Sequence, residues 1–316
     1  AGATALEDGQ PDHDVRLIDP EKPSPNFFIV GAAKGGTTSM YAYLSRHPEV
    51  FMSTLKQPHY FSSFKVKHQF DNFMPVIRQS RSYQELFVGS EPYKAVGEAS
   101  PSYLCDPGAA IRIKSAIPHA KIIISLRNPV QRAYYHYLME FHEGNETLPF
   151  REALEVDENR SEKGWGVSFQ YIELGLYADQ VEQYLNVFGP ANVLVVLFED
   201  FVRDTPAVME QIASFLGIDP TQYPEDCFQR VHNPFEASRS EFARMILRCR
   251  PIRVTSKRLA PKKLRSAVRD RLLFKETQKP KMDDDIRQRL AQHFAPDLER
   301  LEQVLDRDLE LLREQE

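Results

Sequence analysis

The chain has 316 residues and an ordinary share of apolar side chains, which is enough for one large α/β domain or two small ones. Its formal net charge of −5 argues against a general nucleic-acid binder. No stretch approaches the run of about eighteen apolar residues that crosses a bilayer, so no transmembrane segment is expected.

The cysteines are Cys105, Cys227 and Cys249, which are too few and too scattered for a disulfide framework or a zinc site. A Cys227–Cys249 bridge stays open, but buried free thiols are favoured. This cysteine usage suits a reducing, cytoplasmic compartment. An excised domain or a luminal location stays open as well.

Residues 1–25 are polar, acidic and rich in proline, so we expect a flexible leader rather than a signal peptide. The first residue is Ala1 instead of methionine, so we expect that residues upstream were removed or not included. The remainder, 26–316, has no internal repeat and is interpreted as a single domain.

The stretch Asn26–Leu44 predicts a strand, a glycine-rich loop and a helix. The strand is the apolar run Phe27–Val30, and the helix has its first turns at Ser39–Leu44 and is expected to end near Arg46, before His47-Pro48. This arrangement aims several backbone N–H groups and a helix N-terminus at one anion, usually a phosphate.

The spacing of the loop departs from that of nucleotide triphosphatases, whose pattern is G-x-x-x-x-G-K-[ST]. Gly31, Gly36 and Thr38 fit the pattern, but Thr37 occupies the lysine position and the lysine lies inside the loop, at Lys34. A lysine on that side suits a ligand whose scissile bond begins at a 5′-phosphate.

Two later stretches place polar side chains beside strands. Glu98 follows a predicted strand end at Val96-Gly97, where α/β proteins build sites. Arg127 follows the apolar strand Lys121–Leu126 and precedes a helix expected over Val130–His142. An arginine can donate two parallel hydrogen bonds to a phosphate, so Arg127 is a candidate phosphate ligand.

The other predicted elements alternate between strands and helices. Strands are expected at Glu49–Ser53 and at Asn192–Phe198, the latter buried on both faces. Helices are expected over Ala109–Ile117, from Pro149 with Thr147 as the N-cap, and over Phe169–Phe188 with a break near Gly175. A further helix is expected over Pro206–Leu216, ended by Gly217. The stretch 283–316 is expected to form a pair of C-terminal helices separated at Pro296.

Two stretches together resemble the sulfotransferases that use 3′-phosphoadenosine 5′-phosphosulfate (PAPS). The sequence GAAKGGTT (31–38) resembles their 5′-phosphosulfate loop, and IIISLRNPVQRAYYHYL (122–138) resembles their 3′-phosphate segment. The resemblance continues through Gly97–Leu104, Gly175–Gln180 and Val193–Phe201 and is strongest to bacterial enzymes related to the heparan sulfate sulfotransferases.

The resemblance implies an α/β fold that is P-loop-like, with three α/β/α layers and a central parallel sheet. It also implies transfer of a sulfuryl group from PAPS to an acceptor hydroxyl, with release of 3′-phosphoadenosine 5′-phosphate (PAP) and no metal. A carbohydrate, a lipid or another small-molecule alcohol could be the acceptor. A non-catalytic PAP-binding relative and a P-loop kinase-like phosphotransferase are the alternatives.

The resemblance assigns most ligands of the cofactor. Gly35, Gly36, Thr37, Thr38 and Ser39 would hold the 5′-phosphate, and Lys34 would stabilise it as the leaving group. Arg127 would hold the 3′-phosphate together with the residue eight positions later, which is serine in the family and Tyr135 here. Lys275 is a weaker match to a further 3′-phosphate contact.

The segment LKQPHYF (55–61) departs from the family at one position. The family reads Lys-Glu-x-His-Phe-Phe, and its glutamate is the general base. Lys56, His59 and Phe61 match, but Gln57 cannot accept a proton. Gln57 is therefore either an inactivating substitution, or His59 or Glu98 serves as the base, or the acceptor is as acidic as a phenol.

Three further stretches are weaker candidates. Residues Lys65–Glu91 are expected to form a helical insertion over the acceptor side, and Phe228, His232 and Phe235 a wall near the adenine. The basic segment 249–281 is either a solvated face or an attractor for an anionic acceptor. The sequence does not indicate the oligomeric state.

Overall fold

The computed structural model describes residues 18–63, 76–157, 160, 169–229, 236–238, 240, 247, 274–276 and 280–313. Its centre is a five-stranded sheet in which all paired strands are parallel. The strand order is β2-β3-β1-β4-β5, and the strands are β1 (Phe27–Gly31), β2 (Val50–Met52), β3 (Ala95–Ala99), β4 (Lys121–Leu126) and β5 (Val193–Leu197).

Helices cover both faces of this sheet. One face packs against α3 (Ala109–Ala116), α7 (Tyr177–Phe188) and part of α13 (Asp284–Leu305). The other face packs against α1 (Thr37–Leu44), α8 (Phe198–Arg203) and α9 (Thr205–Leu216). The expected three-layer α/β/α fold with a central parallel sheet is confirmed.

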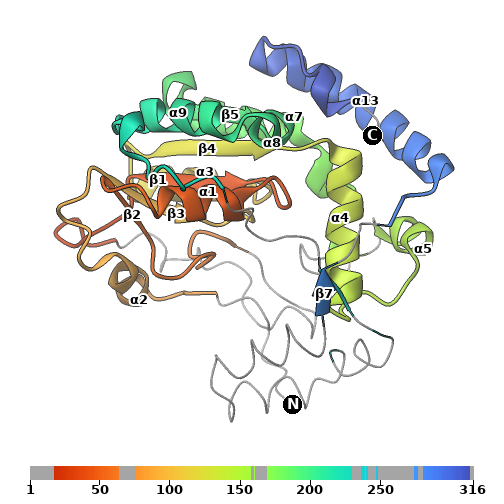
Figure 1. Ribbon diagram of the computed structural model, residues 1–316, viewed down its shortest axis with the longest axis horizontal. Coiled ribbons are helices and arrows are strands. Elements are labelled where there is room, and N and C mark those ends of the chain that lie inside the picture. The colour runs from red at the N-terminus through yellow and green to blue at the C-terminus, as the bar shows by residue number, and fades with distance from the viewer. Residues whose placement is uncertain are drawn as a thin grey trace, which may run out of the picture.

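The remaining elements lie around this core (Figure 1). The helices are α2 (Ser80–Gln84), α4 (Pro129–His142) and α5 (Phe150–Glu155), and short 3₁₀ turns are η3 (Glu85–Phe87), η5 (Glu173–Gly175), η6 (Pro190–Asn192), η7 (Pro220–Gln222) and η9 (Glu310–Leu312). Two further strands, β6 (Glu236–Ser238) and β7 (Phe274–Glu276), pair antiparallel.

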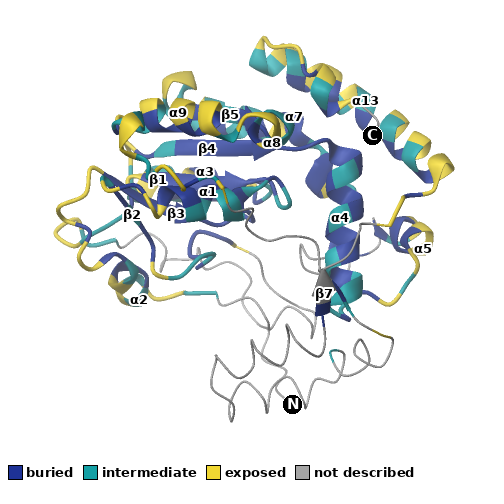
Figure 2. Cartoon of the chain, in the orientation of Figure 1, coloured by how far each residue is buried: buried dark blue, intermediate teal, exposed yellow. Residues whose placement is uncertain are grey.

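The central strands are buried because their side chains alternate between two apolar layers. Phe28 and Ile122 join the core with α3 and α7, whereas Phe27 and Ile123 join the core with α1 and α9. Strands β1 and β4 accordingly appear almost entirely buried in Figure 2.

Parallel pairing brings the ends of distant strands to one edge of the sheet. The glycine-rich loop after β1 lies between the ends of β3 and β4, because β1 pairs with both strands. Strand β4 leads directly toward the N-terminus of α4 (Figure 1). Residues 97–100, the segment 31–38 and Arg127 therefore meet at this edge.

The C-terminal helix pair expected within 283–316 is wrong, because α13 continues through Pro296 from Asp284 to Leu305. A proline in a helix removes one backbone hydrogen bond. The buried stripe of α13, which includes Leu290, Phe294 and Leu298, offsets that loss by packing against α4 and α7.

Two smaller expectations also need correction. Strand β5 is not buried on both faces, since it is an edge strand and its Leu194 and Val195 are half-buried. Helix α5 begins at Phe150 after Pro149, so Thr147 is not its N-cap.

The end of the expected leader is anchored. Gln84 on α2 exchanges hydrogen bonds with the backbone of Asp19 at both its amide oxygen and its amide nitrogen, so residues 18–25 contact the core. Residues 1–17 lie outside the described residues. Among the described helices, none is both long and apolar enough to cross a membrane.

Candidate functional site

The loop between β1 and α1 forms a tight backbone turn. Lys34 and Gly36 both have left-handed backbone conformations, with φ of 70° and 82°. The N–H of Gly35 donates to the carbonyl of Ala32 at 3.0 Å, so this N–H closes the turn. Helix α1 begins at Thr37, earlier than expected, and its first N–H groups have no acceptor within the helix.

Gly35 is required because the loop lies against β4. A Cβ at this position would overlap the carbonyl oxygen of Ser125. Ser125 also donates from Oγ to the Gly35 carbonyl at 2.5 Å, and its own carbonyl accepts from the N–H of Ala32 at 2.7 Å. These contacts fix the loop to the neighbouring strand.

Lys56 lies at the start of α1, and the ammonium group of Lys34, which donates to Sδ of Met139 at 3.4 Å, lies near it. Lys56 donates from Nζ to Oγ1 of Thr38 at 2.9 Å, and Lys34 is close enough for its charge to act on Lys56. Burial and this neighbouring cation lower the pKa of Lys56 to about 8. Two ammonium groups so placed, beside a helix N-terminus, form a site for an anion.

Sequence reasoning noted that Lys56 matches the family pattern but did not place it among the site residues. The position of Lys56 could have marked it as a site residue, because it directly precedes Gln57 at the family's base position. Its contact with Thr38 depends on how β2 and α1 pack, which the pattern alone does not give.

Arg127 forms a second cationic centre beside the loop. Its guanidinium donates to the carbonyl of Lys34 at 3.2 Å and to Oε1 of Gln131 at 3.1 Å. It also lies 4.3 Å from the ring centroids of both Tyr135 and Phe198. The expected pair Arg127 and Tyr135 is therefore together, but the Tyr135 ring, and not only its hydroxyl, contacts Arg127. Phe198 was not expected at the site.

The segment 56–61 follows β2 and holds His59 below the surface. Gln57 and His59 have positive φ values of 61° and 54°. Nδ1 of His59 lies 2.6 Å from Oγ of Ser102, while Nε2 is buried without a hydrogen-bond partner in the described part of the chain. Burial, with the nearby Lys56 charge, lowers the pKa of His59 to about 4, so the ring is neutral at neutral pH.

Glu98 does not follow a strand, as the sequence suggested, but lies inside β3 and is fully buried. Tyr83 donates to its Oε2 at 2.5 Å and Ser100 donates to its Oε1 at 2.6 Å. Burial raises the pKa of Glu98 to about 7. A carboxyl so enclosed is placed to hold structure rather than to meet a substrate.

Some expected site residues fall outside this centre. Phe228 packs edge-on against Tyr43 in the core, with ring centroids 5.3 Å apart, whereas His232 and Phe235 lie outside the described residues. Lys275 is in β7, but the position of its side chain is not described. Most of the segment 65–91 before α2, and most of the basic segment 249–281, are likewise outside the described residues.

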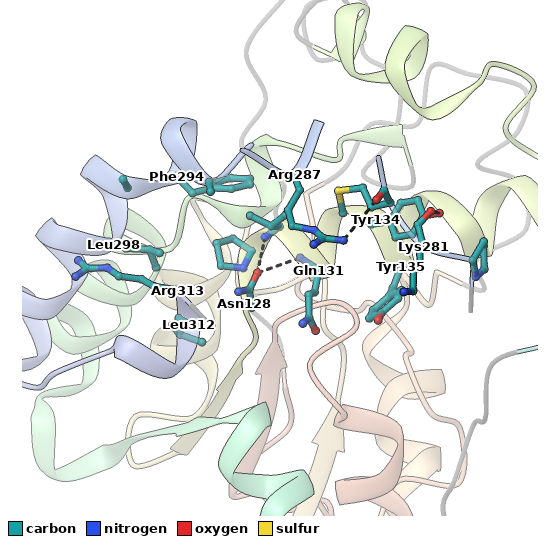
Figure 3. A pocket seen from close by; sticks show the side chains of 16 residues that line it. Asn128, Gln131, Tyr134, Tyr135, Lys281, Arg287, Phe294, Leu298, Leu312 and Arg313 are labelled. Atoms are coloured by element: carbon teal, nitrogen blue, oxygen red, sulfur yellow. Dashed lines mark hydrogen bonds between the residues drawn. The ribbon is translucent and has the colours of Figure 1, made fainter. Parts of the chain in front are cut away.

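A cavity of about 350 Å³ adjoins Arg127, between α4 and α13 (Figure 3). Gln131 lines it and also accepts a hydrogen bond from Arg127. Its polar lining side chains include Asn128, Gln131, Tyr134, Tyr135, Lys281, Arg287 and Arg313. Gln131 and Tyr135, which both contact Arg127, therefore line a space that holds further positive charge.

Comparisons with known proteins agree on one family. The model of the sulfotransferase domain family matches residues 24–302. A solved structure of a sulfotransferase from Alicyclobacillus acidocaldarius is 35% identical, with a TM-score of 0.73, and the match covers 92% of this chain and 99% of that chain.

Curated relatives match over part of their length. The membrane-associated sulfotransferase kil1 of Dictyostelium discoideum is 22% identical over 279 residues, covering 64% of this chain and 58% of that protein. The heparan sulfate glucosamine 3-O-sulfotransferase 3A1 of Mus musculus is 29% identical over 219 residues, covering 69% and 52%. The chain thus spans little more than half the length of these two relatives.

Proposed function

The chain belongs to the sulfotransferase domain family, and we propose that it transfers a sulfuryl group from PAPS to a hydroxyl group of a carbohydrate, releasing PAP. The observation that carries this proposal is the pairing of two cationic centres. Lys56 contacts Thr38 at the N-terminus of α1, Lys34 is near enough for its charge to act on Lys56, and Arg127 donates to the carbonyl of Lys34. A nucleotide with phosphates at both its 5′ and 3′ positions would fit such a pair.

The residues beside the loop fit PAPS as a ligand. Burial and the charge of Lys34 depress the pKa of Lys56, and an anionic ligand would oppose both effects. The first turn of α1 presents backbone N–H groups at Thr37 and Thr38, and Thr37, Thr38 and Ser39 add hydroxyls. Gly36 brings the backbone close without a side chain.

When bound, PAPS supplies an activated sulfuryl group attached to its 5′-phosphate. The N-terminus of α1 would hold that phosphate, and its dipole favours negative charge there by about 0.3–1 kcal/mol. Lys34 and Lys56 would stabilise the charge that develops on the departing phosphate oxygen, as fixed cations do in phosphoryl transfer. The expectation that no metal takes part stays a prediction.

His59 would take the proton of the acceptor hydroxyl at Nε2. Its low pKa keeps the ring neutral at neutral pH, and Nε2 is the basic nitrogen in the tautomer whose Nδ1 carries the proton and donates it to Oγ of Ser102. Gln57 lies two residues before His59 but has no basic lone pair for this task. A positioned base contributes roughly 10²–10⁴-fold to such a reaction.

Arg127 would select PAPS over ATP by binding the 3′-phosphate. Its guanidinium is held between Tyr135 and Phe198 and is 7% exposed, so its orientation is restricted before the ligand arrives. The cavity beside Gln131 would extend this end of the nucleotide site.

A carbohydrate acceptor is favoured because the mouse relative is named for a heparan sulfate glucosamine. The basic segment 249–281 would attract an anionic glycan, but its charges lie largely outside the described residues. A phenol or a lipid alcohol is the competing acceptor.

Calorimetric titration with PAP, AMP and ATP, each with and without Mg²⁺, tests the nucleotide. PAP and AMP differ only in the 3′-phosphate, so metal-independent binding of PAP and much weaker binding of AMP would support the Arg127 assignment. Preference for ATP with Mg²⁺ would instead indicate a phosphotransferase.

Transfer of ³⁵S from labelled PAPS tests the reaction. The acceptor panel comprises heparan sulfate, chondroitin sulfate, 2-naphthol and 1-octanol. We expect label in a polysaccharide. PAP binding without label in any acceptor, even with Gln57→Glu, would favour a non-catalytic relative.

A further inference from the structure

Three hydroxyl groups surround the carboxyl group of Glu98 inside the core. Tyr83 and Ser100 donate to its two carboxyl oxygens at 2.5 and 2.6 Å. The hydroxyl of Tyr103 lies close enough to Glu98 to act on the pKa of its carboxyl. When Glu98 is ionised it only accepts, so the protons of the hydroxyls that bond to it point toward it and their lone pairs face away.

Two of these hydroxyls accept hydrogen bonds from backbone N–H groups of the segment 57–61. The N–H of His59 donates to Oγ of Ser100, and the N–H of Phe61 donates to the hydroxyl of Tyr103, each at 3.2 Å. In the described part of the chain, the hydroxyl of Tyr83 accepts no hydrogen bond from a backbone N–H of this segment. Glu98 is thus linked to the segment through Ser100 and Tyr103 and not through the Tyr83 hydroxyl.

The segment needs this support because of its backbone. Gln57 and His59 both have positive φ, which side-chain-bearing residues adopt only when surrounding contacts hold them. The Gln57 N–H donates to the carbonyl of Ala99 at 3.0 Å, so a third contact comes from the end of β3. The residues at 98–103 together form a template on which the segment lies.

We propose that Glu98 is a positioning residue that, through Ser100 and Tyr103, sets the backbone of His59 and Phe61 and so the direction of the His59 ring. This inference rests on the proposed function only in giving His59 its role as base. The hydrogen-bond relay itself is independent of the reaction. Glu98 contributes to turnover without touching either substrate.

Amide hydrogen exchange at His59 and Phe61, measured by NMR on the full chain, tests the relay directly. Ser100→Ala should speed exchange at His59, Tyr103→Phe at Phe61, and Glu98→Gln at both, by up to about tenfold for one lost hydrogen bond. Tyr83→Phe is the matched control, because it removes the third hydroxyl and keeps the ring that stacks on Tyr60 at 4.1 Å. It should leave both amides within about twofold of wild type.

Two results would overturn the proposal. One is unchanged exchange at His59 and Phe61 in Ser100→Ala and Tyr103→Phe. The other is an equal rise at both amides in all four variants, including Tyr83→Phe, because that pattern reports general loosening. Ser100→Ala and Tyr103→Phe test the two hydroxyl–amide contacts, and Glu98→Asp, which keeps a carboxyl on a shorter side chain, tests Glu98 itself if Glu98→Gln does not fold; unchanged exchange at both amides in Glu98→Asp would count against the proposal.

Turnover and cofactor binding separate positioning from general damage. With the acceptor that the ³⁵S assay returns, Glu98→Gln and Ser100→Ala should lower kcat while the Kd of PAP stays within about twofold, and Tyr83→Phe should keep kcat. Equal losses of kcat in Tyr83→Phe and Ser100→Ala would contradict positioning. If wild type neither binds PAP nor transfers label, the proposed function fails, while the exchange data still judge the relay.

Discussion

Nζ of Lys56 donates a hydrogen bond of 2.9 Å to Oγ1 of Thr38, joining the segment after β2 to the first turn of α1. Gln57, His59 and the phosphate-binding loop are thereby held in one structure. The acceptor side and the cofactor side of the proposed reaction are joined by this contact.

Replacing Lys56 with methionine should slow sulfuryl transfer by roughly 10²–10³-fold, because one fixed charge opposite the leaving group is lost. PAP binding should weaken less, since Lys34 and Arg127 remain. Wild-type turnover should also fall as the pH rises past about 8, where Lys56 loses its proton. Steady-state kinetics from pH 6 to 9 check both effects.

The exposed Lys94 supplies the control for this experiment, since Lys94→Met also removes one positive charge. It should leave kcat and its pH profile unchanged. Equal losses in the two variants would mean that net charge, and not the position of Lys56, matters.

The Tyr135 ring, rather than its hydroxyl, should support cofactor binding. Tyr135→Phe keeps a ring 4.3 Å from the Arg127 guanidinium and should bind PAP about as well as wild type. Tyr135→Ala should weaken PAP binding by about 5- to 30-fold, and Arg127→Lys by more, because lysine cannot make two parallel bonds to a phosphate. Calorimetry with PAP and AMP measures each loss, and a large loss in Tyr135→Phe would show that the hydroxyl is the contact.

Replacing His59 with alanine should lower kcat by roughly 10²–10⁴-fold with little change in PAP affinity, because it removes the proposed base. Adding Gln57→Glu to this variant should restore part of the activity, since the family's carboxylate would return. In the wild-type background Gln57→Glu should raise turnover less than about tenfold. A larger rise there would mean that Gln57 is an inactivating substitution.

Glu98 should make the protein less stable as the pH rises. Its pKa of about 7 exceeds the ordinary value of 4.5, so the folded state holds the proton more tightly than the unfolded state. The resulting stabilisation is complete below about pH 4.5 and is lost as the pH rises through 7. The titratable groups around Glu98 in the described residues are the phenols of Tyr83, Tyr103 and Tyr184, which stay protonated in this range.

Urea unfolding at pH 5 and pH 8 measures this effect. The unfolding free energy of wild type should change between these pH values by about 2 to 3 kcal/mol more than that of Glu98→Gln, which has no titrating carboxyl. An identical pH dependence in the two proteins would show that Glu98 keeps an ordinary pKa.

The strands and helices that follow strong local patterns were predictable from the chain. The runs Phe27–Val30 and Lys121–Leu126 are apolar enough to form only buried strands, and β1 and β4 lie there. Gly217 ends α9 in a left-handed conformation, as its position suggested. The loop at 31–38 and Arg127 were likewise visible, because their residue types and spacing are local properties.

Other features depended on contacts between distant residues. Pro296 signals a break, yet packing of α13 against α4 and α7 overrides it. Glu98 was expected at the end of a strand, and its burial follows only from α2 covering β3 with Tyr83. Phe198 carried no sequence signal for the site, because its contact with Arg127 requires β4 and β5 to be neighbours.

The sequence by itself determined the glycine-rich loop, the central strands and the family, since these are encoded in runs of adjacent residues. Only the tertiary structure decided that Lys56 lies near Lys34 and that the Tyr135 ring stacks on the Arg127 guanidinium. It also decided that Ser100 links the Glu98 carboxyl to the backbone N–H of His59. The physical reason is that a side chain's partners are fixed by which strands pair and which helices cover them, and no local pattern contains that information.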